Sequence, residues 1–587
     1  MPVTPPSNSD IAAIADRYGL GLGPGDVAVF RELLARSVAS YDVVEQLHQE
    51  ALARLPETPA RDWRRPAEAD NELGAWYVTT EIKGTGDGPL AGRRVAVKDN
   101  IAVAGVPMMA GSATVEGFVP RRDATVVTRL LDAGATVAGK AVCEDLCFDG
   151  SSHTSRSGPV RNPWDRSKST GGSSSGSGAL VASGAVDMAL GGDQAGSIRI
   201  PSSFCGIVGH KPTHGLVPYT GALGIENTID HLGPMTRTVR DAAVMLDVLA
   251  GRDGLDPRQR LDAPSGGYLT DLDAGVTGLR IGVLDEGFGI PDVSQPGVDE
   301  TVRASIARLT AAGAEVSQVS VPWHRHGGNL WGVIATDGAF RQMLDGNGYG
   351  MNAPGLHDLE LMEHFARGRA KHAAELSVAV KAFTILGRYS LDQHGNRYYA
   401  MARNLALELA AAYDAALADV DVLVMPTLPV TAFDLPAEDA LSYSPGLAAN
   451  TCPFDITGHP ATSVPAGLSD GLPVGLMIVG RQLADDTCLR VARAYETAVG
   501  GFPSPARLRH RLAGPARTLR LGGEELQCDA GQGTLRDARD ALLAGDDARE
   551  QVPGVRHEDE GHVESPRVAL ECPHERQARL HLRPQRR

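Results

Sequence analysis

Two glycine-rich stretches that contain serine, residues 171–178 and 191–197, hold the side chains best suited to chemistry. A serine hydroxyl can act as a nucleophile or as a proton relay. Consecutive small residues can also turn several backbone N–H groups into one anion-binding concavity. Such donors stabilise the oxyanion that forms in acyl transfer. Together the two stretches indicate an acyl-transfer site.

The second stretch follows a short apolar run, residues 186–190, which we interpret as a strand. Ser197 then lies at the end of the loop after that strand, beside a row of backbone donors. Asp193 and Arg199 flank the loop, and we expect them to form an ion pair that braces it.

The first stretch, read alone, resembles a flexible Gly/Ser linker. A run of small residues from Gly178 follows it directly and predicts a buried helix, which favours an ordered, functional loop. Residues 172–176 also match the G-x-S-x-G elbow of α/β-hydrolases. That elbow must follow a strand, whereas a polar turn precedes these residues, so we disfavour it.

A serine nucleophile needs a general base, and the residues leave two kinds of base open. A buried lysine can serve if desolvation lowers its pKa. Lys98 ends a predicted strand at residues 93–98, where a solvated surface charge is the alternative interpretation. Histidine is the more usual base, and the nearby histidines are His153, His210, His214 and His231.

Strand and helix patterns alternate from about residue 92, which indicates an α/β fold with ligands at the carboxyl ends of strands. We predict a long helix at residues 398–417 and a hairpin at residues 461–480. Residues 324–395 have a less regular pattern with Gly-rich turns, and they could line a substrate pocket.

Three segments are expected: a helical N-terminal segment (1–70), a catalytic domain (71–506) and a polar tail (507–587). The tail has no lysine and no Phe, Trp or Tyr, so we expect it to be mostly disordered. The N-terminal segment could pack on the main domain or mediate dimerisation.

Composition excludes some classes of function. A formal net charge of −16 argues against nucleic-acid binding, which needs clustered Lys and Arg. Neither a secretory signal nor a membrane span is expected. Seven scattered cysteines fit a reducing cytoplasm, and no zinc-like spacing is present.

The run GGSSSGSGALVASGAVDMALGGDQAGSIRIPSSFCGIVGHKPT, residues 171–213, closely resembles the signature of the amidase signature family. The strand motif VAVKDN lies upstream, as in that family, and the resemblance spans roughly residues 75–505. It implies an α/β fold class with a mixed β-sheet core covered by helices on both faces. It also implies a Ser-cisSer-Lys triad without metal or cofactor. Ser197 would be the nucleophile, Ser173 the relay behind a cis peptide bond, and Lys98 the base.

The resemblance also implies that the N–H groups of Gln194, Ala195, Gly196 and Ser197 hold the oxyanion. The chain departs from the family pattern in two places, since Ala195 and Ser175 stand where the family commonly has glycine. Ala195 still has the backbone N–H donor that glycine would supply.

Within the family, the motifs at residues 209–221, 226–238, 345–352 and 450–467 look most like amidases that act after nitrile hydratase. Those enzymes hydrolyse small aliphatic or aromatic amides and form dimers. This resemblance implies a cytoplasmic homodimer with a small-molecule amide substrate. The alternatives are the glutaminase subunit of a tRNA-dependent amidotransferase, and an inactive scaffold that the intact Lys98, Ser173 and Ser197 disfavour.

Overall fold

The structure, a computed structural model, describes residues 3–54, 57–58, 60–350, 354–437, 440 and 446–505. Further along, it describes only the backbone of five short strands. They are β13 (Thr518–Leu521), β14 (Glu524–Gln527), β15 (Ala569–Glu571), β16 (Gln577–Arg579) and β17 (His581–Arg583). Most of the segment predicted to be disordered, residues 507–587, therefore lies outside the described residues.

Contacts divide the chain into residues 1–60 and residues 61–587. The first unit consists of α1 (Asn8–Tyr18) and α2 (Pro24–Ala53). Ser7 forms a capping box with Asp10, and Gly19 ends α1 in the left-handed conformation with a φ of 64°. Pro24 suits the first turn of α2, where its missing N–H costs nothing. The domain boundaries expected at residues 70 and 506 stay predictions.

A twelve-stranded sheet forms the framework of the second unit, in the order β1-β2-β4-β3-β5-β7-β6-β11-β12-β10-β8-β9. Parallel and antiparallel pairs both occur, as in β3–β5 and β11–β12. The strands are β1 (Trp63–Arg64), β2 (Trp76–Lys83), β3 (Arg94–Lys98), β4 (Thr136–Ala141), β5 (Met188–Asp193), β6 (Val208–Lys211), β7 (His231–Thr236), β8 (Arg280–Leu284), β9 (Glu315–Val319), β10 (Val422–Pro426), β11 (Ala461–Ser469) and β12 (Leu472–Gly480).

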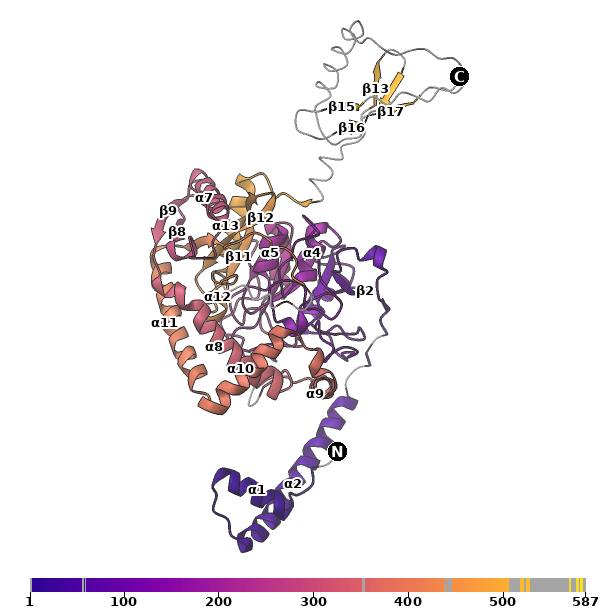
Figure 1. Cartoon of the computed structure of the whole chain (residues 1–587), viewed down its shortest axis with the longest axis vertical. Helices are drawn as coiled ribbons and strands as arrows, with labels where there is room; N and C mark the ends of the chain where they lie inside the picture. Colours follow the sequence, from indigo (N-terminus) through magenta and orange to yellow (C-terminus); the bar gives the residue numbers. More distant parts are fainter. Residues whose placement is uncertain are drawn as a thin grey trace, which may run out of the picture. The chain divides into compact units, whose positions relative to one another are not determined.

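Helices cover both faces of this sheet, which confirms the predicted fold class (Figure 1). Every residue of β5 and β10 is buried, as expected for strands with both faces covered. The helices of this unit are α3 (Thr125–Asp132), α4 (Ser175–Ser183), α5 (Arg199–Cys205), α6 (Val239–Leu249), α7 (Pro296–Ala311), α8 (Gly327–Ala339), α9 (Leu359–His372), α10 (Val378–His394), α11 (Arg397–Asp419), α12 (Pro453–Ile456) and α13 (Asp485–Ala498).

The long helix and the hairpin predicted near the C-terminal end of this unit are confirmed as α11 and as β11–β12. The less regular pattern inferred for residues 324–395 is wrong except at the Gly-rich turn, residues 346–349. That region is largely helical, with α8, α9 and α10 and the π-helix η5 (Phe340–Asp345). Among the described residues, no helix has both the length and the apolar character needed to span a membrane.

Two neighbouring parallel strands, β3 and β5, position the predicted site. Val97 lies opposite Leu190, so both strands reach the same edge of the sheet. Lys98 ends β3, and Asp193 ends β5. The strand thus extends through Gly191 and Gly192, which were expected to belong to the loop, and the loop itself begins at Gln194.

Candidate active site

Lys98 and Ser173 are in direct contact although 75 residues separate them. The Lys98 Nζ donates to Ser173 Oγ at 2.8 Å and to the Gly192 carbonyl at 3.3 Å. Both side chains are fully buried. The parallel pairing of β3 with β5 brings Gly192 beside Lys98 and so fixes the direction of the lysine side chain.

The Ser173 loop has a backbone that only its glycine-rich sequence permits. The Gly172–Ser173 peptide bond is cis, as the family resemblance implies. Gly171 has a φ of 74°, and a Cβ there would lie 2.9 Å from Ile200 Cγ2. Glu144 N–H donates to the Ser173 carbonyl at 3.3 Å. These contacts fix the serine within reach of Lys98.

Ser174 and Ser175 have structural partners. Ser174 Oγ donates to the Gly192 carbonyl at 3.1 Å and accepts from Gly192 N–H at 3.2 Å. Ser175 begins α4, and its hydroxyl donates to the Val142 carbonyl at 3.4 Å. Ser174 is the serine of the G-x-S-x-G match, and no strand leads into it, so the structure confirms that this match is not a nucleophile elbow.

Ser197 lies just before α5 and lines a cavity together with Gly172. The Ser174 N–H donates to the Ser197 carbonyl at 3.3 Å, which joins the two glycine-rich loops. The structure therefore brings together all three residues expected to form the triad: Lys98 and Ser173 in contact, and Ser197 on the adjoining loop.

The loop from Gln194 to Ser197 presents a row of unused donors. None of its four backbone N–H groups donates to another group in the part of the chain that the structure describes. The next two N–H groups, those of Ile198 and Arg199, donate to Asp193 Oδ2 at 3.0 and 3.3 Å. An arrangement of free N–H groups beside a serine can bind an oxyanion.

The ion pair expected between Asp193 and Arg199 is confirmed, and it has a third member. Arg199 donates to Asp193 Oδ1 at 2.9 Å and to Asp455 Oδ2 at 2.8 Å, and all three side chains are fully buried. Burial alone would raise the pKa of Asp193, but Arg199 outweighs it and holds that pKa at about 2. Burial and the neighbouring Asp193 raise the pKa of Asp455 well above its usual value.

The four histidines considered as bases have partners outside the serine loops. His210 bonds Thr462 Oγ1 and Asp485 Oδ1. His153, His214 and His231 bond Ser151 Oγ, the Asn227 carbonyl and the Ile229 carbonyl. Burial lowers the pKa of His214 to about 3, so this ring is neutral. The geometry therefore favours lysine over histidine as the base.

A cavity of about 640 Å³ opens onto Ser197. Its wall is mostly apolar, with Phe148, Ile225, Phe288, Trp331, Phe383 and Leu447. Gln194 also lines it and is 2% exposed. Its Nε2 donates to Tyr219 OH at 3.1 Å, while its Oε1 has no partner among the described residues.

The expectation that residues 324–395 line a pocket is confirmed, whereas Phe148, Phe288 and Leu447 were not predicted. Trp331 and Phe383 belong to the region expected to be irregular, and they meet edge to face with ring centroids 6.4 Å apart. Cys147 is buried and also lines the cavity. In the described part of the chain, no three His, Cys, Asp or Glu side chains lie close enough to hold a metal ion.

A buried lysine bonded to a serine, a second serine on a loop of free N–H groups, and an apolar cavity are the groups that acyl transfer to a serine would need. The amidase family model matches residues 61–489. The chain belongs to the amidase signature family and is an amidohydrolase.

Among its relatives, the chain is 55% identical to an enantioselective amidase from Rhodococcus rhodochrous, over 87% of this chain and 99% of the relative. It is 39% identical to a glutamyl-tRNA(Gln) amidotransferase subunit of Methanosarcina acetivorans, over 70% of this chain and 85% of that protein. Among solved structures, the peptide amidase of Stenotrophomonas maltophilia has a TM-score of 0.60 and 31% identity, covering 71% of this chain and 85% of the other.

Proposed function

We propose that this amidohydrolase converts small aliphatic or aromatic carboxamides to the carboxylic acid and ammonia through Ser197, Ser173 and Lys98. The observation that carries the proposal is the buried contact of 2.8 Å between Lys98 Nζ and Ser173 Oγ, beside the loop that ends in Ser197. A free serine is a weak nucleophile, and this contact connects it to a base.

In the first half-reaction, Ser197 Oγ attacks the amide carbonyl and forms a C–O bond. Its proton passes to Ser173, whose own proton passes to Lys98 Nζ. The N–H groups of Gln194, Ala195, Gly196 and Ser197 hold the oxyanion. As the tetrahedral intermediate collapses, the C–N bond breaks, and the proton returns through Ser173 to the leaving nitrogen, which departs as ammonia.

In the second half-reaction, water attacks the acyl ester. Its proton follows the same route to Lys98 and then returns to Ser197 Oγ as the C–O bond to the enzyme breaks. The carboxylic acid leaves and the free serine is regenerated. No metal or cofactor takes part in either step.

The cavity supports the substrate class. A volume of about 640 Å³ lies within the range of small-molecule sites, and aromatic and aliphatic side chains dominate its wall. An uncharged phenyl or alkyl group would bury apolar surface there. The resemblance to amidases that follow nitrile hydratase supports amides derived from nitriles as the natural source.

A cytoplasmic location fits the cysteines. Five cysteines among the described residues are free and buried. Free thiols persist in reducing compartments.

Ammonia release from propionamide, benzamide and glutamine tests the proposal. We expect the purified chain to hydrolyse the first two, and Ser197→Ala to lose activity by about 10³-fold or more. Ser183→Ala is the matched control, because Ser183 ends α4 and its hydroxyl donates to Leu180 O within the same helix. Full activity in Ser197→Ala would refute the nucleophile assignment.

The glutaminase subunit of a tRNA-dependent amidotransferase remains the second candidate, since relatives that are amidotransferase subunits are 39% identical. It predicts turnover of glutamine alone, and the same assay separates the two functions. A chain that hydrolyses none of the three amides would be the inactive scaffold.

We also propose a homodimer, in which the helical N-terminal segment (1–70) joins two catalytic domains (71–506). Support comes from the apolar residues that α2 exposes, among them Phe30, Leu33, Tyr41 and Val44.

A further inference from the structure

The carbonyl groups of the Gln194–Ser197 loop all have hydrogen-bond donors, in contrast to its N–H groups. The Gln194 carbonyl accepts from Trp331 Nε1 at 2.7 Å, and the Ala195 carbonyl accepts from Thr451 Oγ1 at 2.5 Å. The Gly196 carbonyl accepts from Ile200 N–H at 2.6 Å. The Ser197 carbonyl accepts from Ser174 N–H, as described above.

This pattern fixes the directions of the free donors. In a trans peptide, the carbonyl of one residue and the N–H of the next lie in one plane and point in opposite directions. Trp331 holds the plane that carries the Ala195 N–H, and Thr451 holds the plane that carries the Gly196 N–H. Each of these two planes depends on one side chain from a distant segment of the chain.

Thr451 makes three separate contacts with this region. Besides its hydroxyl bond to Ala195, its carbonyl accepts from Arg199 Nη1 at 2.9 Å. Its side chain also packs against Gly196, where a Cβ would lie 2.4 Å from Thr451 Oγ1. Thr451 is fully buried, and it precedes α12 in a segment that also lines the cavity.

We propose that Thr451 and Trp331 are positioning residues that aim the N–H groups of Ala195 and Gly196 at the oxyanion. The inference rests on the proposed role of this loop. Without either side-chain donor, one peptide plane can rotate, and the donor that it carries leaves its catalytic direction. The loss then falls on the transition state, because the oxyanion exists only there.

Thr451→Val and Thr451→Ser form the test pair, because valine has the shape of threonine without the hydroxyl and serine keeps the hydroxyl. For benzamide hydrolysis we expect Thr451→Val to lose about 10- to 100-fold in kcat, somewhat less than removal of a donor. KM should stay within about 3-fold, since ground-state binding is little affected. Thr451→Ser should recover most of kcat.

A boronic acid probes the same groups without turnover, because it forms a tetrahedral anionic adduct with a serine nucleophile. Inhibition by phenylboronic acid should weaken in Thr451→Val in proportion to the loss in kcat/KM. Thr384→Val is the control, since its hydroxyl donates within α10 to the Val380 carbonyl. It should change neither kcat nor inhibition.

The positioning role is overturned if folded Thr451→Val keeps kcat within about 2-fold of Thr451→Ser, or if KM alone changes. Should Thr451→Val fail to fold, Trp331→Phe tests the other plane by the same criteria of kcat and inhibition. A failure of the proposed function looks different, because Ser197→Ala would then remain active in the same assay.

Discussion

At the scale of single residues, Ala195 and Gly196 meet opposite demands although they are neighbours. Ala195 does not adopt a positive φ, so its Cβ causes no backbone strain where the family commonly has glycine. Gly196 has a φ of 136°, and Thr451 leaves no room for a Cβ there. The loop therefore needs its glycine at one position, and the substitution at the other leaves the N–H donor in place.

Glu144 contacts the Ser173 loop through its backbone N–H, and its carboxyl group is fully buried. Its Oε2 accepts from the N–H groups of His153 and Thr154, both at 2.9 Å, and from Thr154 Oγ1 at 2.8 Å. Its Oε1 has no partner among the described residues. Burial, assisted by the charge of Asp149, raises the pKa of Glu144 to about 7.

This raised pKa predicts a pH-dependent stability that Glu144→Gln removes. Between pH 4.5 and 7 the folded state binds more protons than the unfolded state, so this group's contribution to stability falls as pH rises. The total change is up to about 3 kcal/mol. Glutamine resembles the protonated acid, so thermal unfolding should show the variant losing less stability than wild type from pH 5 to pH 8.

Glu363→Gln removes the same charge from an exposed position on α9 and serves as the control. Its melting temperature should follow that of wild type across this range. If Glu144→Gln follows wild type equally closely, Glu144 is ionised in the folded protein throughout, and the assignment is wrong.

At the scale of elements, the sequence predicted the strand that ends at Lys98 and the strand that leads to Ser197. Both are short runs of mostly apolar residues, and nearly all of their residues are buried. The sequence could not show from the residues alone that Ser173 contacts Lys98. That contact depends on Glu144, Gly192 and Ser197, which reach the Ser173 loop from separate parts of the chain. The family resemblance supplied this connection.

The region around α8 and α10 was misjudged for a physical reason. Glycines such as Gly332 and Gly387 lie inside these helices, and glycine normally indicates a turn. Tertiary packing overrides that local preference: a Cβ at Gly387 would lie 2.6 Å from Phe340 Cβ, so the small residue permits close helix packing. The pocket lining expected from this region is nevertheless present, since Trp331 and Phe383 contribute to the cavity wall.

Arg199 connects β5, α5 and α12, and its removal tests how far the site depends on their junction. Arg199→Ala leaves Asp193 and Asp455 buried without their cation, which costs about 3–5 kcal/mol in such pairs. We expect a melting temperature several degrees lower and a fall in kcat, measured by calorimetry and ammonia release. Arg388→Ala, on the exposed surface of α10, should change neither. An Arg199→Ala variant with full stability and activity would show that the bracing is dispensable.

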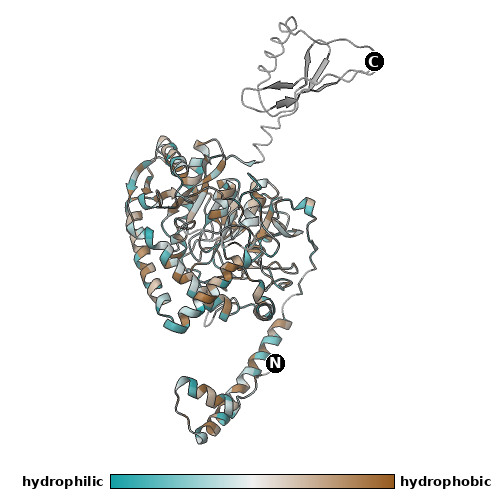
Figure 2. Ribbon diagram, viewed as in Figure 1, coloured by the Kyte–Doolittle hydropathy of each residue, from teal (hydrophilic) through white to brown (hydrophobic). Residues whose placement is uncertain are grey.

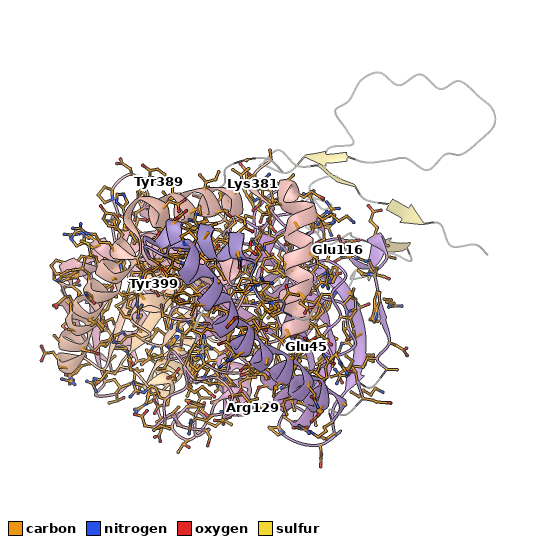
Figure 3. All side chains as sticks on the ribbon, turned by 90° about the horizontal axis from the view of Figure 1, so that it is seen from below. Glu45, Glu116, Arg129, Lys381, Tyr389 and Tyr399 are labelled. Carbon is orange, nitrogen blue, oxygen red and sulfur yellow. The ribbon has the colours of Figure 1, made fainter. Side chains whose placement is uncertain are left out.

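At the scale of the whole molecule, α2 in the first unit and α10 in the second each carry exposed apolar side chains, and both helices contain hydrophobic residues along the ribbon in Figure 2. On α2, Phe30, Leu33, Tyr41 and Val44 share one face at helical spacing. On α10, Val378, Ile385 and Tyr389 do the same. Lys381 and Tyr389 locate α10 in Figure 3, and Tyr399 locates α11. Exposed apolar faces of this kind are typical of protein interfaces.

The α2 face supports a specific prediction about assembly. If it joins two copies, wild-type protein should sediment at about twice the 61.7 kDa of one chain. Leu33→Glu with Val44→Glu places two charges in the interface core, and desolvating them would cost several kcal/mol. The double variant should therefore sediment as a monomer at micromolar concentration.

The control is Arg36→Glu with Gln46→Glu, which makes the same helix more negative outside that face and should leave the dimer intact. A wild-type monomer, or a double variant that stays dimeric, contradicts the assignment. Activity towards benzamide should persist in the monomer, because Lys98, Ser173, Ser197 and the cavity all belong to residues 61–587.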